Sequence, residues 1–385
     1  MRIGFDAKRA YQNNTGLGHY SRTLISSLAK FYPHEEYFLF APRQTDMYDT
    51  SVYPAICTIT PQTFPSSLFR SAWRSSWVKK DLLEQKIDLY HGLSHEIPAG
   101  IHNTGIKSVV TIHDLIFERY PEQYNAIDVF IYRKKFRYSC KHADRIIAIS
   151  EQTKRDIIEF YKIPEEKIIV CYQSCNPSFG IEVSSEEKKR IRSLYQLPEK
   201  FFLYVGSIIE RKNLLTIVKA INKLKEKSPI PLVVIGDGGS YKEKVKAYIK
   251  ENSLSERIIF LSEKESLKSL PSFRSANDFP AIYQMATAMI YPSIFEGFGI
   301  PVLEALWSKL PVITTNLSCL PETGGDAAIY VDPFNENQMA DAMYTIINNT
   351  EVADDMRTRG WRHAHQFTQE KCAAGVMNVY KELVR

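Results

Sequence analysis

Two carboxylates at a fixed spacing are the first candidates for chemistry in this chain. Glu296 and Glu304 are separated by seven residues, and Gly299 and Pro301 lie between them. Because proline suits the first turn of a helix, we predict a helix over 302–307, with Glu296 in the loop before it and Glu304 one turn into it. Glycine lets backbone amides approach a ligand, a helix N-terminus favours phosphate, and carboxylates accept hydrogen bonds from sugar hydroxyls. The segment therefore predicts an anion site flanked by two carboxylates, with a buried loop and solvated glutamates as the alternative.

Two adjacent cations form a second candidate site. Arg211 and Lys212 follow a predicted strand that Gly206 ends, and a helix is predicted from about Leu214. Adjacent cations at a helix start oppose the helix dipole unless an anion lies there. Arginine can bind two phosphate oxygens at once and lysine acts as a point charge, so the pair indicates a diphosphate site. A solvated cationic turn is the alternative.

Histidines follow two predicted strands of the N-terminal half. His113 and Asp114 come directly after the apolar strand 108–112. Residues at the carboxyl end of such a strand face the ligand site, so we predict that His113 contacts a sugar hydroxyl and that Asp114 orients it. A histidine that caps a strand end is the alternative. His91 and His95 follow another strand, and for them an acceptor pocket and a structural role stay equally open.

A Gly-x-Gly pair, Gly16 and Gly18, lies in the predicted loop after the first strand. Such a pair is weak evidence alone. The dinucleotide fingerprint needs a third glycine where Ser21 stands, and an acidic residue about 20 positions further on. No such acidic residue is apparent, so a nicotinamide cofactor is not expected.

The segments around these residues resemble retaining glycosyltransferase family 4. The resemblance rests on YPS before Glu296, EGFGIPVLEA across the pair and PVITTNLSCLPETGGDAAIYVDP after it, and NTGLGHYSR resembles the mannosyltransferase-like branch. It covers nearly the whole chain and implies an α/β fold of the GT-B type, with two Rossmann-like doubly wound domains that face a central cleft. The implied domains are an acceptor-binding domain, 1–180, on which the C-terminal helix 366–385 packs, and a nucleotide-sugar-binding domain, 181–365.

The resemblance also implies a role for each candidate. Glu304 would bind the ribose of the nucleotide, and Glu296 would hold hydroxyls of the transferred sugar. Arg211 and Lys212 would stabilise the leaving diphosphate, and His113 would contact the sugar. The remaining donor contacts are expected from Gly206, Phe298, Gly299, Ile300, Gly16 and Gly18.

We predict no metal and no other cofactor. Many nucleotide-sugar enzymes hold a divalent metal on the diphosphate with an Asp-x-Asp motif, and this sequence contains none. The charge that develops on the diphosphate would then be met by Arg211, Lys212 and the backbone amides of 297–300. Electrostatic stabilisation of this type can contribute several kcal/mol to a barrier.

Composition limits the class of protein. The 385 residues suggest two domains, and the hydrophobic content of 44% with 24% charged residues is typical of a globular protein. No apolar run reaches the ~20 residues of a spanning helix, and the N-terminus has no apolar signal core. Six cysteines complete no zinc pattern, and a net charge of +5 with no nucleic-acid motif disfavours a nucleic-acid partner. We expect a cytoplasmic protein, with peripheral contact to the inner face of the membrane left open.

The elements that must position these residues form two α/β series. Alternating strands and helices predict parallel sheets covered on both faces. In the first half we expect strands at 2–5, 37–40, 89–91, 108–112, 145–148 and 168–171, and helices around 71–86, 126–141 and 151–161. In the second half we expect strands at 201–205, 231–235, 258–261, 288–291 and 312–314, and helices at 185–195 and 367–384.

The function that these expectations favour is transfer of a hexose, with mannose favoured, from GDP-mannose or a UDP-sugar to a hydroxyl of a growing glycan. Cell-surface polysaccharide or lipopolysaccharide synthesis would use such an enzyme. The acceptor would be a glycan or a lipid-linked glycan. Basic and aromatic residues over 69–80 and 132–138 suit an anionic membrane, although an ordinary solvated helix face explains them equally well. A nucleotide-sugar epimerase or hydrolase and a non-catalytic nucleotide-sugar binder are the alternatives.

Overall fold

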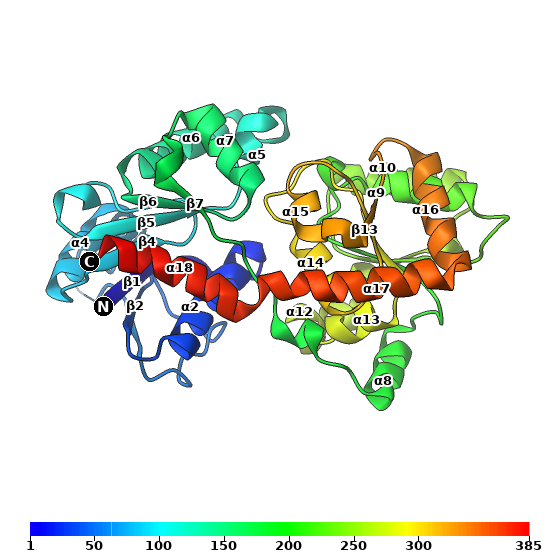
Figure 1. Cartoon of the computed structure of the whole chain (residues 1–385), viewed down its shortest axis with the longest axis horizontal. Coiled ribbons are helices and arrows are strands. Elements are labelled where there is room, and N and C mark those ends of the chain that lie inside the picture. Colours follow the sequence, from blue (N-terminus) through cyan, green and yellow to red (C-terminus); the bar gives the residue numbers. More distant parts are fainter. Residues whose placement is uncertain (63, 385) are drawn as a thin grey trace. The chain divides into compact units, whose positions relative to one another are not determined.

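The computed structural model describes residues 1–62 and 64–384, and it divides the chain into two compact units. Unit 1 comprises Met1–Cys175 and Phe367–Arg385, and unit 2 comprises Asn176–Gln366. Each unit is a parallel sheet with helices on both faces (Figure 1). Each unit therefore has its own core and is described by itself.

Unit 1 contains a seven-stranded sheet in the order β3-β2-β1-β4-β5-β6-β7, and every pair of neighbours is parallel. The strands are β1 (Arg2–Asp6), β2 (Glu36–Phe40), β3 (Ile56–Ile59), β4 (Leu89–Gly92), β5 (Lys107–Ile112), β6 (Arg145–Ala148) and β7 (Ile168–Val170). The helices are α1 (Lys8–Gln12), α2 (Gly16–Phe31), α3 (Arg70–Ala72), α4 (Val78–Glu84), α5 (Ile116–Arg119), α6 (Ala126–His142), α7 (Glu151–Tyr161) and α18 (Gln369–Leu383).

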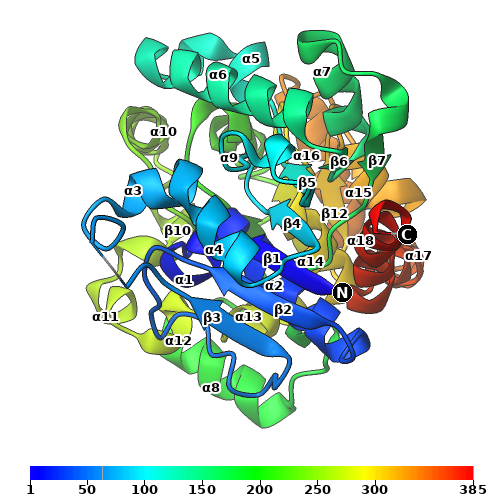
Figure 2. The same ribbon diagram turned by 90° about the vertical axis from the view of Figure 1, so that its left-hand side faces the viewer.

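Both faces of this sheet are covered. Helices α4, α6 and α7 lie beside the strands of this sheet (Figure 2). Their apolar residues pack with side chains of β2, β4, β5 and β6 in one core cluster. The C-terminal helix α18 packs against α2, and the hydroxyl of Tyr380 on α18 lies 2.5 Å from Nδ1 of His91 on β4. The end of the chain thus completes the core of the first unit.

Two predicted elements of unit 1 differ in the structure. The predicted loop over 14–18 is wrong in its second half, because α2 already begins at Gly16. Gly18 is packed so closely that a Cβ there would lie 1.8 Å from the carbonyl oxygen of Asn13. The predicted helix over 71–86 is divided into α3, a π-helical turn at Trp73–Trp77 and α4, and the turn places Trp73 in the core. Strand β3 was not predicted.

Unit 2 contains a six-stranded parallel sheet in the order β10-β9-β8-β11-β12-β13. The strands are β8 (Phe202–Val205), β9 (Leu232–Ile235), β10 (Ile258–Phe260), β11 (Ala288–Tyr291), β12 (Val312–Thr314) and β13 (Ala328–Tyr330), of which β13 was not predicted. The helices are α8 (Ser185–Tyr195), α9 (Leu214–Lys223), α10 (Ser240–Glu251), α11 (Glu265–Lys268), α12 (Pro271–Arg274), α13 (Phe279–Met285), α14 (Ile300–Trp307), α15 (Leu320–Gly324), α16 (Glu336–Asn348) and α17 (Thr350–Ala364).

The strand order of unit 2 creates a topological switch between β8 and β11. From β8 the chain builds outward to β9 and β10, and it then returns to the other side of β8 with β11. The loops that leave the carboxyl ends of β8 and β11 therefore run to opposite sides, and such a point is where open α/β sheets bind ligands. These two loops carry Arg211, Lys212 and Glu296.

The loop after β8 packs against the loop after β9 without room for side chains. Gly236 has a φ of +153°, and a Cβ there would lie 1.8 Å from the carbonyl oxygen of Gly206. The amide of Gly206 donates to the carbonyl of Ile235 at 2.9 Å, and the amide of Ile208 donates to that of Asp237 at 2.7 Å. These contacts hold the start of the Arg211 loop in place.

Replacing Gly236 with alanine is expected to destabilise unit 2, because the added Cβ would force the two loops apart and strain the backbone. We expect a loss of more than about 2 kcal/mol, measured as a lower midpoint of urea unfolding. Gly239→Ala in the same loop is the control, since nothing lies within 4 Å of its Cβ position. Equal midpoints for the two variants would contradict the role given to Gly236.

Candidate active site

The loops after β8 and β11 bring three of the predicted site residues into contact. Oε1 of Glu296 lies 3.0 Å from Nη1 of Arg211 and 3.0 Å from Nζ of Lys212. Arg211 also donates to the carbonyl oxygen of Phe295, and the backbone carbonyl of Arg211 accepts from the amide of Ile294 at 2.8 Å. The two loops are therefore joined by both side-chain and backbone contacts.

Glu296 is almost buried, with 9% of its surface exposed, and hydrogen bonds orient its carboxylate. Oε1 accepts from the hydroxyl of Ser293 at 2.6 Å and from that of Tyr291 at 3.1 Å. Burial alone would raise the pKa of Glu296, but Lys212 and Arg211 outweigh it and, with the Ser293 hydrogen bond, lower the pKa to about 2. The carboxylate is thus ionised throughout the physiological range.

The second carboxylate oxygen of Glu296 is left for a ligand. All four side-chain donors converge on Oε1, and none of the described residues donates to Oε2. A carboxylate held in this way can accept a hydrogen bond from a sugar hydroxyl without losing its cations.

The charges of this cluster do not cancel. Arg211 and Lys212 contribute two positive charges and Glu296 contributes one negative charge, so one positive charge remains in a site with little water. Nζ of Lys212 is fixed by the hydroxyl of Tyr291, at 2.6 Å, and lies over its ring. An excess cation that the fold holds in place is suited to an anionic ligand.

Gly206 makes room for this lysine. Its φ is +152°, and a Cβ at this position would lie 3.3 Å from Cδ of Lys212. Any residue larger than glycine would press on the stem of Lys212. The contact of Gly206 with a donor stays a prediction.

The start of α14 supplies backbone donors in the same loop. The helix begins at Ile300, two residues earlier than predicted, and Gly299 caps it with a φ of +90°. This positive φ favours glycine, and a Cβ here would also displace Cδ2 of Leu320, which would lie 2.9 Å away. The amides of Gly299 and Ile300 donate to none of the described residues, as is usual for the first amides of a helix, and Phe298 lies in the same loop.

Glu304 lies in the second turn of α14 and is a different kind of carboxylate. Its Oε2 accepts from the hydroxyl of Tyr283 at 2.8 Å, and no cation pairs with it among the described residues. Burial raises the pKa of Glu304 to about 7, against the small opposing effect of the Tyr283 hydrogen bond. A ligand that donates hydroxyl hydrogen bonds to this carboxylate would stabilise its ionised form.

His113, which belongs to unit 1, is held by neighbours of its own. Its side chain is 5% exposed, its Nε2 lies 2.9 Å from the carbonyl oxygen of Leu93, and its ring packs edge-on against Tyr20. Burial lowers the pKa of His113 to about 4, the Leu93 hydrogen bond opposes this shift, and Arg9 adds to it. The neutral ring therefore donates from Nε2 to Leu93, and Nδ1 is left as an acceptor.

The structure adds residues to the site that the sequence did not single out. Tyr291 and Ser293 orient Glu296, and Tyr283 bonds Glu304. The first two stand in the YPS segment at the end of β11, so their place just before Glu296 was an available signal. In unit 1, Arg74 donates to Asp6 from Nε at 3.0 Å and also from Nη2, and it donates to Glu96 at 3.0 Å. No local sequence pattern marks this contact.

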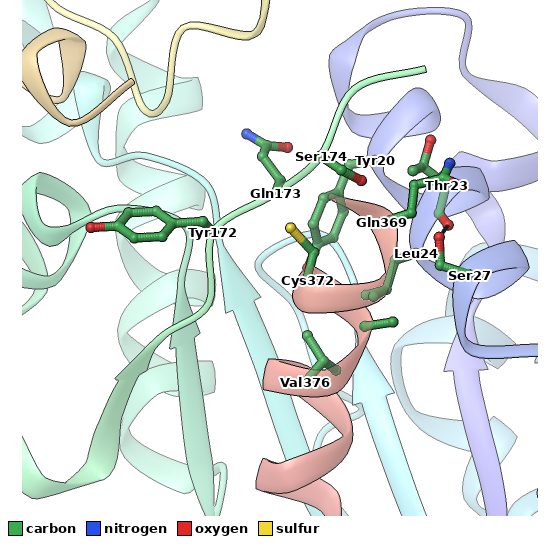
Figure 3. A pocket seen from close by; sticks show the side chains of 11 residues that line it. Tyr20, Thr23, Leu24, Ser27, Tyr172, Gln173, Ser174, Gln369, Cys372 and Val376 are labelled. Carbon is green, nitrogen blue, oxygen red and sulfur yellow. Dashed lines mark hydrogen bonds between the residues drawn. The ribbon is translucent and has the colours of Figure 1, made fainter. Parts of the chain in front are cut away.

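The predicted residues of unit 1 do not form such a cluster among themselves. Gly16 and Gly18 lie in the first turn of α2, whereas His113 follows β5. A hollow between α2, α18 and 172–174 has a volume of about 10 Å³ (Figure 3). It is large enough for one water molecule and too small for a sugar.

No group of three or more His, Cys, Asp and Glu side chains is arranged to hold a metal ion within 1–62 and 64–384. In the same part of the chain, no helix is both long and apolar enough to cross a membrane.

Replacing Glu296 with glutamine is expected to destabilise the protein, because Arg211 and Lys212 would lose the carboxylate that they share in a buried site. Breaking a buried pair of this kind costs about 3–5 kcal/mol. Added pyrophosphate should then raise the Tm of Glu296→Gln more than that of the wild type, because the anion would supply the missing negative charge. Glu210→Gln, an exposed neighbour, is the control, and an equal effect of pyrophosphate on all three proteins would contradict the assignment.

Replacing Glu304 with glutamine is expected to change stability in a pH-dependent way. The pKa of Glu304 is about 7 in the folded protein, against 4.5 for an ordinary glutamate, so the folded state binds more protons. The contribution of this group to stability therefore falls as the pH rises from about 4.5 through 7. Glu304→Gln should melt at a higher temperature than the wild type at pH 8.5 and at nearly the same temperature at pH 5. Since each kcal/mol shifts the Tm by about 2–4 °C, differential scanning calorimetry resolves the effect, and a pH-independent difference would contradict it.

Comparison with known proteins agrees with the geometry. The family model described as glycosyl transferases group 1 matches residues 185–363, and the model described as glycosyltransferase family 4 matches residues 15–179. The O-antigen chain mannosyltransferase B of Escherichia coli is 26% identical over 399 residues, which cover 100% of both chains. The O-antigen chain mannosyltransferase RfbU of Salmonella typhimurium is 29% identical over 62% of this chain and 60% of its own length.

The fold also occurs in solved structures. A glycosyltransferase from Rickettsia africae superposes with a TM-score of 0.74 at 19% identity, over 100% of this chain and 98% of that one. The two parallel sheets, the two matching models and the full-length relative agree with one another. The chain is therefore a glycosyltransferase of the GT-B fold.

Proposed function

We propose that this glycosyltransferase transfers a hexose, with retention of the anomeric configuration, from a nucleoside diphosphate sugar to a hydroxyl of a growing glycan. The observation that carries the proposal is the uncancelled positive charge of Arg211 and Lys212 beside Glu296. A diphosphate supplies the missing negative charge, and a sugar next to it supplies hydroxyls for the free oxygen of Glu296. Neither the diphosphate nor the sugar alone would use both features.

Mannose is the favoured sugar, and synthesis of O-antigen or a related lipopolysaccharide glycan is the favoured process. Two relatives are named O-antigen chain mannosyltransferases, and one of them aligns over its whole length. GDP-mannose is accordingly the first donor to test, and a UDP-sugar is the second. We place the enzyme in the cytoplasm.

Each residue then has a distinct part in the reaction. The bond between the anomeric carbon and the diphosphate breaks, and Arg211 and Lys212 stabilise the charge that develops on the departing oxygen. Oε2 of Glu296 accepts a hydrogen bond from the transferred sugar and positions its anomeric carbon, and Glu304 accepts one from the ribose. The acceptor oxygen bonds to the anomeric carbon from the same face, and its proton passes to a phosphate oxygen of the leaving group.

The other predicted contacts have smaller parts. The amides of the 298–300 loop would hold phosphate oxygens, and Gly206 would keep the Lys212 stem in place. His113 would contact the sugar. Because its Nε2 is hydrogen-bonded to the carbonyl oxygen of Leu93, Nδ1 is left to accept a hydrogen bond from a sugar hydroxyl. Gly16 and Gly18 would lie near the donor phosphate. No metal has a part in this proposal, because the two cations already supply the positive charge.

The proposal predicts metal-independent binding of one nucleoside diphosphate. Calorimetric titration with GDP, UDP and ADP in EDTA should give tight binding of one of them, with GDP expected. Arg211→Ala removes a cation that would bind the diphosphate, and Glu304→Ala removes the proposed ribose contact. Each variant should weaken binding of the nucleoside diphosphate by at least about 10-fold. Lys223→Ala, an exposed cation of the same unit, should bind as the wild type does.

The titrations, together with measurements of GDP-mannose consumption and product formation, discriminate the alternative functions. If no diphosphate bound at millimolar concentration, the donor site assigned here would be wrong. If GDP bound and GDP-mannose were consumed at the same rate with and without a glycan acceptor, the enzyme would be a nucleotide-sugar hydrolase or epimerase. If GDP-mannose bound and no product formed with any acceptor, the protein would be a nucleotide-sugar binder.

A further inference from the structure

Unit 1 contains a cavity of about 520 Å³ that no part of the donor site uses. It opens between α6, the segment 96–99 and the π-helical turn that precedes α4. Its walls are mainly apolar and include Ile97, Pro98, Ala99, Phe130 and Ile131. A volume of this size is typical of cavities that bind small organic ligands.

An exposed apolar stripe on α6 leads into this cavity. Ile127, Phe130 and Ile131 are 69%, 63% and 41% exposed, and their spacing places them on one face of the helix. The opposite face of α6 is already buried, since Val129 and Phe136 pack in the core of unit 1. The stripe therefore has no role in the core, and contiguous exposed apolar side chains of this kind mark a binding surface.

The charged groups of the cavity are arranged in two layers. Arg74 on the floor is paired with Asp6 and Glu96, so these carboxylates already have partners. Lys135 at the rim shares Glu96 at 3.3 Å. Lys134 forms no hydrogen bond or ion pair with the described residues, and its Nζ lies 5.7 Å from the centre of the Phe130 ring.

The side chains that line the cavity have a net positive charge. The cavity has three cations, Arg74, Lys134 and Lys135, and two carboxylates, Asp6 and Glu96, so one positive charge is uncompensated. Lys134 carries that charge at the point where the apolar stripe enters the cavity. A ligand that combines an apolar chain with an anionic group beside it would use both the apolar wall and this uncompensated charge.

We propose that this cavity and the stripe Ile127–Phe130–Ile131 bind an apolar chain that carries a phosphate or diphosphate, as the lipid end of a lipid-linked acceptor does. The apolar chain lies along Phe130 and Ile131, and the phosphate lies at Lys134 and Lys135. The proposal rests on the proposed transfer to a glycan acceptor, and it specifies how that acceptor is carried.

Binding of farnesyl diphosphate, a soluble prenyl diphosphate, tests the proposal. The titration is made below the micellar concentration and with GDP at saturation, so that the donor site is occupied. Pyrophosphate and farnesol serve as probes that have only one of the two features. We expect farnesyl diphosphate to bind at least about 10-fold more tightly than either, because only it engages both the apolar wall and the lysines.

Variants assign the binding to the cavity. The double variant Phe130→Ser/Ile131→Ser should weaken farnesyl diphosphate binding at least about 10-fold and leave GDP binding unchanged. Lys134→Gln should reduce the preference for farnesyl diphosphate over farnesol. Val52→Ser, which changes an exposed apolar residue elsewhere in unit 1, should have no effect. An unchanged Tm and GDP affinity would show that each variant is folded.

Other outcomes overturn the proposal. Equal affinities for farnesyl diphosphate and pyrophosphate, or full binding by the double variant, would show that the cavity is not the site. If the double variant lost only its binding to vesicles containing phosphatidylglycerol, the stripe would be a membrane contact and not an acceptor site. Failure of the donor assignment is separate, because Arg211→Ala should lose GDP and retain farnesyl diphosphate.

Discussion

The buried carboxylate of Glu296, shared by Arg211 and Lys212, is the interaction on which the donor site depends. Removing one carboxylate and two cations from water is unfavourable unless each is paired and hydrogen-bonded. Tyr291 and Ser293 provide the further hydrogen bonds, and the glycine at 206 lets the lysine stem lie close to the backbone. The cluster nevertheless has a net charge of one positive unit, because two cations share one carboxylate. An anionic ligand would neutralise this charge.

The architecture of unit 2 makes this cluster possible. Strands β8 and β11 are neighbours, and the chain leaves them toward opposite sides of the sheet. Residues 84 and 85 positions apart, Arg211 and Lys212 on one loop and Glu296 on the other, therefore meet at the carboxyl edge. The close contact between Gly206 and Gly236 then holds the first of these loops, so a backbone constraint helps to set the position of the cations.

The two glutamates of the motif are opposite in their electrostatics. Glu296 is held ionised by two cations, whereas Glu304 is half-buried beside a tyrosine and desolvation raises its pKa to about 7. Above about pH 7 the ionised Glu304 therefore lowers the stability of the folded protein. A ligand hydroxyl that donates a hydrogen bond to this carboxylate would stabilise its ionised form. Sites that cost stability in the empty protein are typical of binding functions. Unit 1 has a different chemistry, because its cavity combines apolar walls with a free lysine.

The sequence by itself determined the elements whose signals are local. The helices at Glu151–Tyr161 and Ser185–Tyr195 and the strands at Arg145–Ala148, Ala288–Tyr291 and Val312–Thr314 have the predicted bounds, because caps, periodicity and apolar runs act over a few residues. The short strands β3 and β13 and the π-helical turn at Trp73–Trp77 were missed, since only their neighbours in space stabilise them.

The tertiary structure alone decided how the site residues are used. The motif indicated that Glu296, Arg211 and Lys212 have one function, but their shared oxygen and the depressed pKa arise from burial and contacts between distant loops. The same holds for the bond from His113 to Leu93 and for the cavity beside α6, which residues of β1, β4, α6 and the π-helical turn form together. Such features depend on which surfaces lose water on folding, and no local pattern encodes that.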